Sequence, residues 1–203
     1  MLKLYYASGA CSISPHIALR ELGLPFELER VDFASGKKTT SGTDFNAVNP
    51  KGYVPALQLE NGEVLTEGAV MVQYIADLKP EAELAPRQGT FERVRLQEWL
   101  NFIATELHKG LGPLFSQQAP AEYKQATTDR VKGRLGFVAK RLEGKQFLLG
   151  DRFSIADGYL FYILRSWKQF LKQELPADLV DYYQRLAERP AIAKALEVEG
   201  LTA

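Results

Sequence analysis

Cys11 is the only cysteine of the 203-residue chain and the first residue whose type and position suggest chemistry. It follows a short apolar segment and lies at the expected start of a helix, where free backbone N–H groups and the helix dipole favour a thiolate over a thiol. Its neighbours in Gly9-Ala10-Cys11-Ser12 are small, so a ligand could approach the backbone closely. Free cysteine is also often a small buried hydrophobe, so position alone leaves a reactive and a structural interpretation open.

His108 is the second candidate, and it ends a segment with helical spacing. Asn101, Thr105 and His108 fall within about 60° of one another at the usual rotation of 100° per residue. A different face of this helix is apolar and carries Leu96, Leu100, Ile103 and Leu107. The polar stripe could line a cleft, although a solvated face is the commoner explanation. His16, the other histidine, is interpreted as a surface or packing residue.

Two further segments could bind a ligand that resembles an amino acid. Proline at the start of a strand explains Val54-Pro55 structurally, whereas a cis peptide would present the Val54 backbone as one rung for an extended peptide. Thr66-Glu67-Gly68 is expected to begin a helix, with Thr66 as its cap. Free N–H groups there suit a carboxylate, and the Glu67 side chain could bind an ammonium group. A capped helix with an acidic first turn is the commoner arrangement.

The elements that must position these residues divide the chain into two halves. Alternation and turn residues predict a β-α-β-α-β-β-α order over about 80 residues. Its parts are a half-buried strand at 2–6, a helix ending at Gly23 with Ser12 or Ser14 as its cap, a strand at 25–32, a mobile loop at 34–43, an Asn61-Gly62 hairpin and a helix at 67–78.

The second half reads as helical throughout. Helices are expected at 91–109, 121–142, 154–170, 177–188 and 191–197. Ser154 and Asp157 fit a capping box, and the run 159–164 is apolar on every face, as in a central buried helix. We therefore expect an α/β domain at 1–80, a linker at 81–89 that is rich in proline and charge, and an all-α domain at 90–203.

Composition excludes several classes of protein. The formal net charge is zero and the pI about 6.8, so no nucleic-acid partner is expected. The longest apolar run, 159–164, is far shorter than the roughly 20 residues that cross a bilayer, so no membrane association is expected. The N-terminus lacks a signal-peptide pattern and one cysteine fits a reducing compartment, which predicts a cytoplasmic protein. No zinc, dinucleotide or phosphate-binding motif occurs, so no metal is expected.

The sequence resembles the cytosolic glutathione S-transferases, and within them the bacterial beta class. The resemblance covers essentially the full length and depends on the motifs Gly9-Ala10-Cys11-Ser12, Val48-Asn49-Pro50-Lys51-Gly52, Val54-Pro55-Ala56-Leu57, Leu65-Thr66-Glu67-Gly68 and Glu98 to Lys109. It implies a thioredoxin-like N-terminal domain that binds glutathione as co-substrate, followed by an all-helical domain, in a homodimer.

Site residues follow from the resemblance by position. It implies that Cys11 lies against the glutathione sulfur and can form a mixed disulfide, and that His108 makes a hydrogen bond near this sulfur. The implied glutathione-binding residues are Tyr6, Ser12, Lys37, Val54, Pro55, Glu67, Gly68, Asn101, Thr105, Glu106 and Lys109, some of them from a partner subunit.

Two positions differ from the family's usual pattern. Other classes place a catalytic tyrosine in the region of Tyr6, but the beta-class pattern around Cys11 is complete, which favours Cys11. Many relatives have serine where this chain has Gly68, and the missing hydroxyl is expected to weaken glutathione binding by roughly 1 kcal/mol.

The resemblance implies conjugation of the glutathione thiolate to small apolar electrophiles, as in detoxification. Two alternatives stay open: thiol-disulfide exchange or peroxide reduction through Cys11, and a non-catalytic carrier of apolar ligands. The electrophile would contact scattered residues of the helical half, Phe115 and Trp167 among them.

Overall fold

The computed structural model describes residues 1–203, and their contacts form two compact units. The first unit contains Met1–Leu84 and Arg189–Ala203, and the second contains Ala85–Glu188. The division at residue 84 lies inside the expected linker at 81–89. Helix α9 (Pro190–Glu199), which we expected to belong to the domain at 90–203, instead groups with the first unit because it packs against α1 (Ile13–Leu22).

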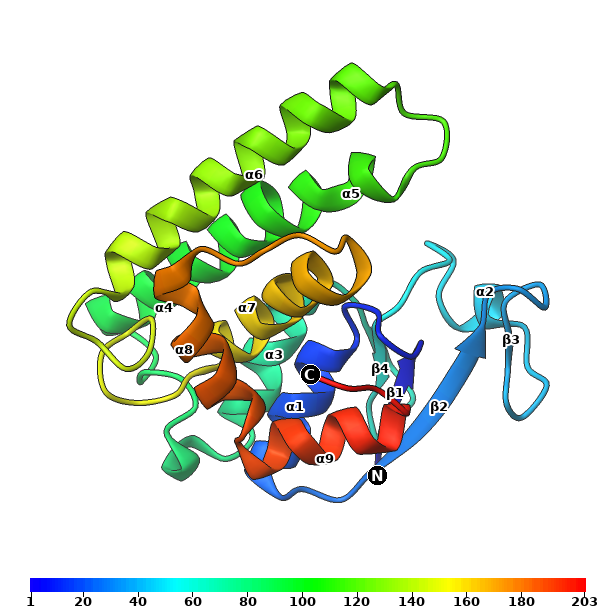
Figure 1. Ribbon diagram of the computed structural model, residues 1–203. Coiled ribbons are helices and arrows are strands. Elements are labelled where there is room, and N and C mark those ends of the chain that lie inside the picture. Colours follow the sequence, from blue (N-terminus) through cyan, green and yellow to red (C-terminus); the bar gives the residue numbers. More distant parts are fainter. The chain divides into compact units, whose positions relative to one another are not determined.

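The first unit has a thioredoxin-like mixed sheet of five strands in the order β3-β2-β1-β4-β5 (Figure 1). Strand β1 pairs in parallel with β2 and antiparallel with β4, and the outer pairs β2·β3 and β4·β5 are antiparallel. The strands are β1 (Leu2–Tyr6), β2 (Phe26–Asp32), β3 (Lys38–Thr39), β4 (Ala56–Gln58) and β5 (Val64–Leu65). The predicted hairpin at Asn61-Gly62 is confirmed, since it joins β4 to β5.

The sheet is more fully covered than alternation alone predicted. The strand at 2–6 was expected to be half-buried, but Tyr5 is only 7% exposed because the short helix α2 (Phe45–Val48) places Phe45 against its ring. Helix α1 packs against α3 (Gly68–Asp77) as well as α9. The loop expected to be mobile at 34–43 contains β3, which pairs with β2. Backbone hydrogen bonds therefore order a segment that has no apolar period.

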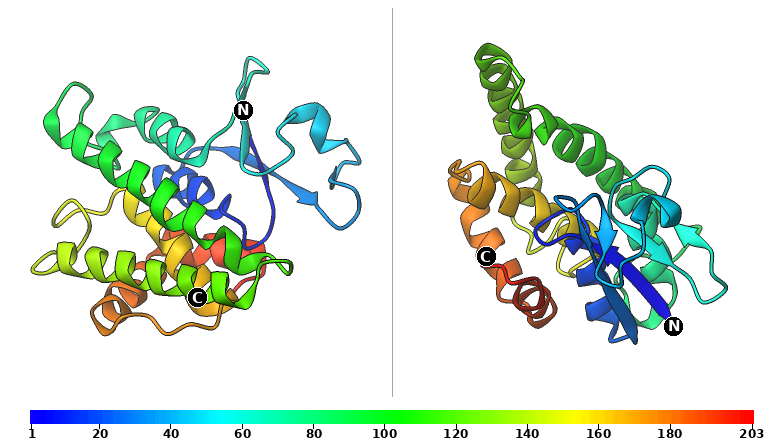
Figure 2. Two further views of the ribbon diagram at one scale, coloured as in Figure 1. Left: turned by 90° about the horizontal axis from the view of Figure 1, so that it is seen from above. Right: turned by 90° about the vertical axis from the view of Figure 1, so that its right-hand side faces the viewer.

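The second unit is helical, as predicted, and the long helix α6 lies beside α5 (Figures 1 and 2). Its helices are α4 (Phe91–Phe102), the π-helix η2 (Ile103–His108), α5 (Lys109–Phe115), α6 (Ala121–Leu142), α7 (Ile155–Arg165), the π-helix η3 (Ser166–Phe170) and α8 (Ala177–Ala187). A short 3₁₀ helix, η1 (Pro80–Ala82), precedes this unit in the chain. No helix in the chain is long and apolar enough to span a membrane.

Helix α7 is the buried centre of the second unit, as its composition predicted. Every residue from Ile155 to Arg165 is buried. The predicted capping box is confirmed, because the Asp157 carboxylate accepts the Ser154 backbone N–H at 2.8 Å. The two π-helices were not predicted, because their wider turns change the rotation per residue without changing the apolar composition.

Candidate active site

Cys11 lies in the loop between β1 and α1, two residues before the helix that begins at Ile13. Its thiol donates a hydrogen bond to the Val54 carbonyl oxygen, with an Sγ–O distance of 3.4 Å. Burial raises the pKa of the Cys11 thiol to about 11, although the backbone N–H groups of Cys11 and Ser12 oppose this shift. The sequence left a reactive thiolate and a small buried side chain both open at this position. Desolvation outweighs the helix terminus, so the free protein holds a thiol.

Val54 brings its backbone to Cys11 from the loop before β4. The Val54-Pro55 peptide is cis, which is the isomer that the sharper sequence hypothesis required. The Val54 carbonyl accepts the Cys11 thiol, while its N–H makes no hydrogen bond within the chain. One backbone donor therefore lies next to the only cysteine and is available to an extended ligand.

Glu67 occupies a strained position at the start of α3. Its φ of 68° is in the left-handed region, which is uncommon for a residue with a Cβ and is frequent at binding sites. Its carboxylate accepts the Lys51 ammonium at 2.5 Å and the Tyr53 hydroxyl at 3.3 Å. The hydrogen bond from Lys51 is the main reason that the pKa of Glu67 is lowered. Glu67 therefore stays ionised and can receive a ligand ammonium group.

The predicted cap of this helix was wrong. Helix α3 begins at Gly68 with Glu67 as its N-cap residue, and the Thr66 hydroxyl instead accepts the Lys51 ammonium at 3.0 Å. Lys51 competes for the groups that we had assigned to a ligand. Lys51 precedes the β4–β5 hairpin and residues 66–67 follow it, so no local sequence pattern indicates that they pair.

Lys37 and Pro55 lie beside the same loops. A Cβ placed on Gly52 would lie 2.5 Å from the Lys37 ammonium nitrogen, so this lysine reaches the loop before Val54. A Cβ on Gly68 would lie 3.9 Å from Pro55 Cγ, which is an ordinary contact. The structure thus brings Lys37, Pro55 and Gly68 to the loops that carry Val54 and Glu67.

Tyr6 and Ser12 are engaged in packing. The Ser12 hydroxyl is fully buried and bonds the backbone of Ala7 at both N–H and C=O, each at 3.2 Å, instead of capping α1. The Tyr6 ring lies 6.3 Å from the ring of His16, and the pKa of Tyr6 is raised by burial and then by the charge of Glu199. The Ser12 hydroxyl is therefore not available to a ligand.

His16 is a buried, fully paired residue and does not lie on the surface. Its Nδ1 is 2.8 Å from the Glu199 carboxylate, and its Nε2 accepts the Arg20 Nε–H at 2.7 Å. Arg20 is only a donor, so Nδ1 carries the imidazole proton. The interpretation as a packing residue is confirmed, and the surface alternative was wrong.

His108 is the last residue of the π-helix η2 in the second unit. Its Nδ1 lies 2.7 Å from the Tyr159 hydroxyl, and its ring makes edge contacts with Tyr159 and Tyr162. Burial, and to a smaller extent the charge of Lys109, lowers the pKa of His108 to about 4. The imidazole is therefore neutral near pH 7. It can donate a hydrogen bond but is a weak base.

The polar stripe predicted around His108 is only partly formed. Asn101 and Thr105 are exposed and linked, since the Thr105 hydroxyl donates to the Asn101 carbonyl at 3.0 Å. His108, by contrast, is half-buried against α7. The prediction assumed a regular α-helix, and the π-helical turns between these residues change their relative orientation.

Glu106 and Lys109 are near the surface of this unit. Glu106 accepts the Arg134 Nε–H at 2.9 Å, in a pair whose side chains are 42% and 46% exposed. Lys109 is exposed. No group of three or more His, Cys, Asp or Glu residues is arranged to hold a metal ion.

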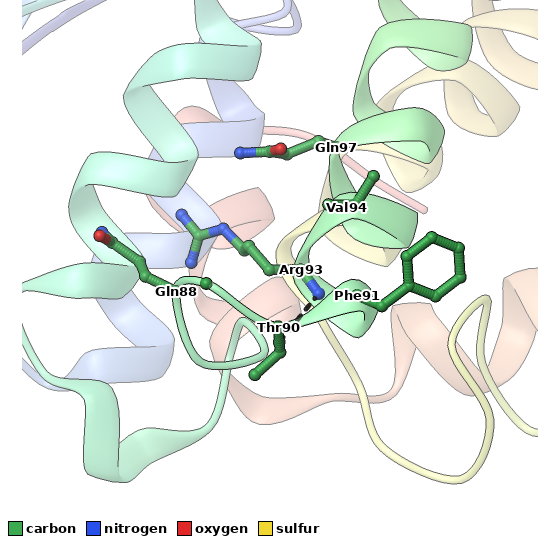
Figure 3. Close-up of a pocket in the computed structure, with 7 residues that line it drawn as sticks. Gln88, Thr90, Phe91, Arg93, Val94 and Gln97 are labelled. Carbon is green, nitrogen blue, oxygen red and sulfur yellow. Dashed lines mark hydrogen bonds between the residues drawn. The ribbon is translucent and has the colours of Figure 1, made fainter.

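A separate cavity lies at the start of α4 (Figure 3). It is lined by Gln88, Gly89, Thr90, Phe91, Arg93, Val94 and Gln97. Thr90 caps the helix by accepting the Arg93 backbone N–H at 3.2 Å, and the Arg93 guanidinium donates to Pro86. None of the predicted site residues lines this cavity.

Sequence reasoning missed Lys51 and Tyr159. Lys51 was visible only as part of a loop motif, and Tyr159 was assigned to the core because its segment is apolar on every face. A signal for Tyr159 did exist, because a tyrosine hydroxyl inside a fully buried helix needs a hydrogen-bond partner.

Comparison with known proteins identifies the family. The model of the glutathione S-transferase N-terminal domain matches residues 9–78, and that of the C-terminal domain matches residues 102–190. Glutathione S-transferase GstA of Escherichia coli O157:H7 is 45% identical over 202 residues, which cover 98% of this chain and 100% of GstA.

Solved structures agree over the same length. A sphingomonad glutathione S-transferase complexed with glutathione is 44% identical, with a TM-score of 0.93 and coverage of 98% of this chain and 100% of that one. A beta-class enzyme of Sphingomonas chungbukensis is 46% identical, with a TM-score of 0.92 and the same coverage. With both domain models matched in order and relatives aligned over nearly its whole length, the chain belongs to the glutathione S-transferase family.

Proposed function

We propose that this protein conjugates the thiolate of glutathione to small, apolar electrophiles. The observation that carries the proposal is the free Val54 N–H next to Cys11, on loops that also hold the ionised Glu67 carboxylate. These groups match a γ-glutamyl peptide that carries a thiol. The named relatives favour conjugation over disulfide exchange or a carrier role. The pKa of Cys11, about 11, also disfavours an attacking Cys11 thiolate.

Glutathione contacts are assigned residue by residue, as the resemblance to the family suggests. The Val54 backbone pairs with the cysteinyl residue of glutathione, with Pro55 beside it, and Glu67 and the Gly68 N–H hold the γ-glutamyl end. Lys37 suits the glycyl carboxylate because its ammonium group already lies beside Gly52. Tyr6 and Ser12 contribute through the backbone of their loop, because the Ser12 hydroxyl is fully used within the protein. Asn101, Thr105, Glu106 and Lys109 supply polar contacts, some of them across a dimer.

The two catalytic residues act on the sulfur as neutral groups. The single Cys11 S–H, which donates to the Val54 carbonyl in the free protein, turns to the bound sulfur, and it and the His108 imidazole then donate hydrogen bonds that favour the glutathione thiolate over the thiol. The thiol proton passes to water, and the thiolate then attacks an electrophilic carbon. In a chlorinated nitroarene, the new C–S bond replaces the C–Cl bond and chloride leaves. This chemistry fits a beta-class enzyme of detoxification in the cytoplasm.

Two assays on the same preparations test the function. Conjugation is followed with glutathione and a chlorodinitrobenzene, and mass spectrometry follows adducts after incubation with oxidised glutathione. We expect turnover by the wild type, loss of any glutathione adduct in Cys11→Ala, and a fall in kcat of about tenfold or more in His108→Gln. Binding of apolar dyes without turnover would indicate a carrier. Equal loss of both activities in Cys11→Ala would indicate that Cys11 carries the redox chemistry and the conjugation.

A homodimer is the second part of the proposal. On α3, Val70 and Tyr74 are 50% and 36% exposed, and Leu78, which directly follows the helix at the same spacing, is 41% exposed. On α4, Phe91 and Val94 are 64% and 51% exposed. Apolar rows of this kind on each unit suit an interface between two copies. Sedimentation velocity should give a dimer for the wild type and a monomer for Tyr74→Glu, and a monomeric wild type would contradict the proposal.

A further inference from the structure

The protein holds the His108 imidazole by more contacts than a hydrogen-bond donor to a ligand needs. Its Nδ1 lies 2.7 Å from the Tyr159 hydroxyl, whereas Nε2 makes no hydrogen bond within the chain. Tyr159 and Tyr162, both on α7, contact the imidazole edge-on, with ring centroids 5.7 and 5.0 Å away. One ring nitrogen is therefore committed to the protein and the other is available to a ligand.

We propose that Tyr159 is a positioning residue: its hydroxyl donates to His108 Nδ1 and holds the neutral imidazole as the Nε2–H tautomer, which directs that N–H to the glutathione sulfur. The inference depends on the role proposed above for His108. It adds a residue on which that role depends, and this residue makes no contact with the reacting atoms itself.

The electrostatic surroundings support a donor and oppose a base. The ionisable groups around the ring are Lys109 on its own helical segment and the hydroxyls of Tyr159 and Tyr162 on α7. Burial and the Lys109 cation keep the imidazole neutral, with a pKa of about 4. A base this weak is poorly matched to a thiol, whose pKa is roughly 8.5. A neutral imidazole assists the thiolate best by donating, and it donates from Nε2 only when Nδ1 accepts.

Tyr159 is well placed to fix this tautomer. It is 4% exposed, so its orientation is set by the packing of α7, whose residues are all buried. The hydrogen-bond partner of one imidazole nitrogen commonly determines which of the two nitrogens carries the proton. Tyr162 is a matched control, because its ring also contacts His108 and it is 8% exposed, but no hydrogen bond joins it to the imidazole.

The first test is the tautomer itself, measured by two-bond ¹H–¹⁵N correlation spectra of the histidine side chains. The chain has only two histidines, and the spectrum of His108→Gln assigns them. We expect His108 to be protonated at Nε2 in the wild type and in Tyr162→Phe, and to become a mixture of tautomers in Tyr159→Phe. A proton on Nδ1 in the wild type would overturn the proposal without any variant, and so would an unchanged tautomer in Tyr159→Phe.

The second test is kinetic and separates this inference from the proposed function. Tyr159→Phe should lower kcat about tenfold, leave the KM for glutathione within about twofold, and raise the apparent pKa of the bound thiol by about one unit. Tyr162→Phe should change none of these values. If His108→Gln leaves conjugation intact, the role of His108 is wrong. If His108→Gln lowers kcat and Tyr159→Phe does not, only the positioning role of Tyr159 is wrong.

Discussion

Burial keeps both Cys11, in the first unit, and His108, in the second, in their neutral forms, and it shifts their pKa values in opposite directions. Burial raises the pKa of the thiol to about 11 and lowers that of the imidazole to about 4. Their partners differ, because Cys11 contacts backbone groups of Val54 and Ser12, whereas His108 contacts the Tyr159 side chain. The first site is therefore built from loop backbone and the second from side chains on helices. Substitution of neighbouring side chains should retune His108 far more than Cys11.

The largest expected effect concerns the reactivity of Cys11. A pKa of about 11 leaves a thiolate fraction near pH 7 that is about 300-fold below that of an ordinary cysteine. Alkylation by iodoacetamide, followed by mass spectrometry, should be slow and should increase about tenfold per pH unit up to pH 10. A rate that levels off near pH 8.5 would show that the helix terminus cancels the effect of burial on the thiol pKa.

The next effect is on the free energy of unfolding, and it tests the lowered pKa of His108. His108 is neutral in both states above its unfolded pKa of about 6.5, so it imposes no penalty there. As the pH falls toward 4, the unfolded chain binds a proton that the folded chain resists, and stability drops by up to about 3 kcal/mol. Urea unfolding of the wild type and His108→Gln between pH 8 and 4 should show a steeper loss in the wild type. If the free energy of unfolding fell in parallel with pH in the two proteins, the lowered pKa of His108 would be contradicted.

Glu67 is the exception among the loop residues, because its side chain provides the proposed contact. Glu67→Gln should raise the KM for glutathione about tenfold and leave kcat nearly unchanged, since the contact is remote from the sulfur and acts equally in ground and transition states. Steady-state kinetics with varied glutathione measure this. Glu63→Gln, on the exposed hairpin, is the control and should change neither constant. A fall in kcat alone would place Glu67 in the chemical step.

The smallest effect is a gain. Gly68→Ser should lower the KM for glutathione about fivefold, which corresponds to roughly 1 kcal/mol for one added hydrogen bond. The new Cβ meets only Pro55 Cγ at 3.9 Å, so the loop accommodates it. Gly68→Ala adds the same Cβ without the hydroxyl and should leave the KM near the wild-type value. Equal KM values for the two variants would exclude a hydroxyl contact.

Sequence reasoning predicted most of the fold because local signals were strong. The Asn61-Gly62 hairpin, the glycine that ends α1 and the capping box at Ser154 are each specified by a few adjacent residues. The apolar spacing placed α6 within its observed bounds. Strand β3, the start of α3 and the π-helices were missed, because they depend on hydrogen bonds between segments or on helical turns that residue types do not encode.

The sequence by itself determined which residues are present for chemistry and roughly where each lies along the chain. It placed Cys11 before a helix, His108 at the end of another and Val54 before a strand. Tertiary structure decided their state: the Cys11 thiol stays protonated, Lys51 binds Glu67, and Tyr159 bonds one nitrogen of His108. Protonation depends on desolvation and on neighbouring groups, and part of that surrounding comes from residues distant in sequence, such as Tyr159, which is 51 positions from His108.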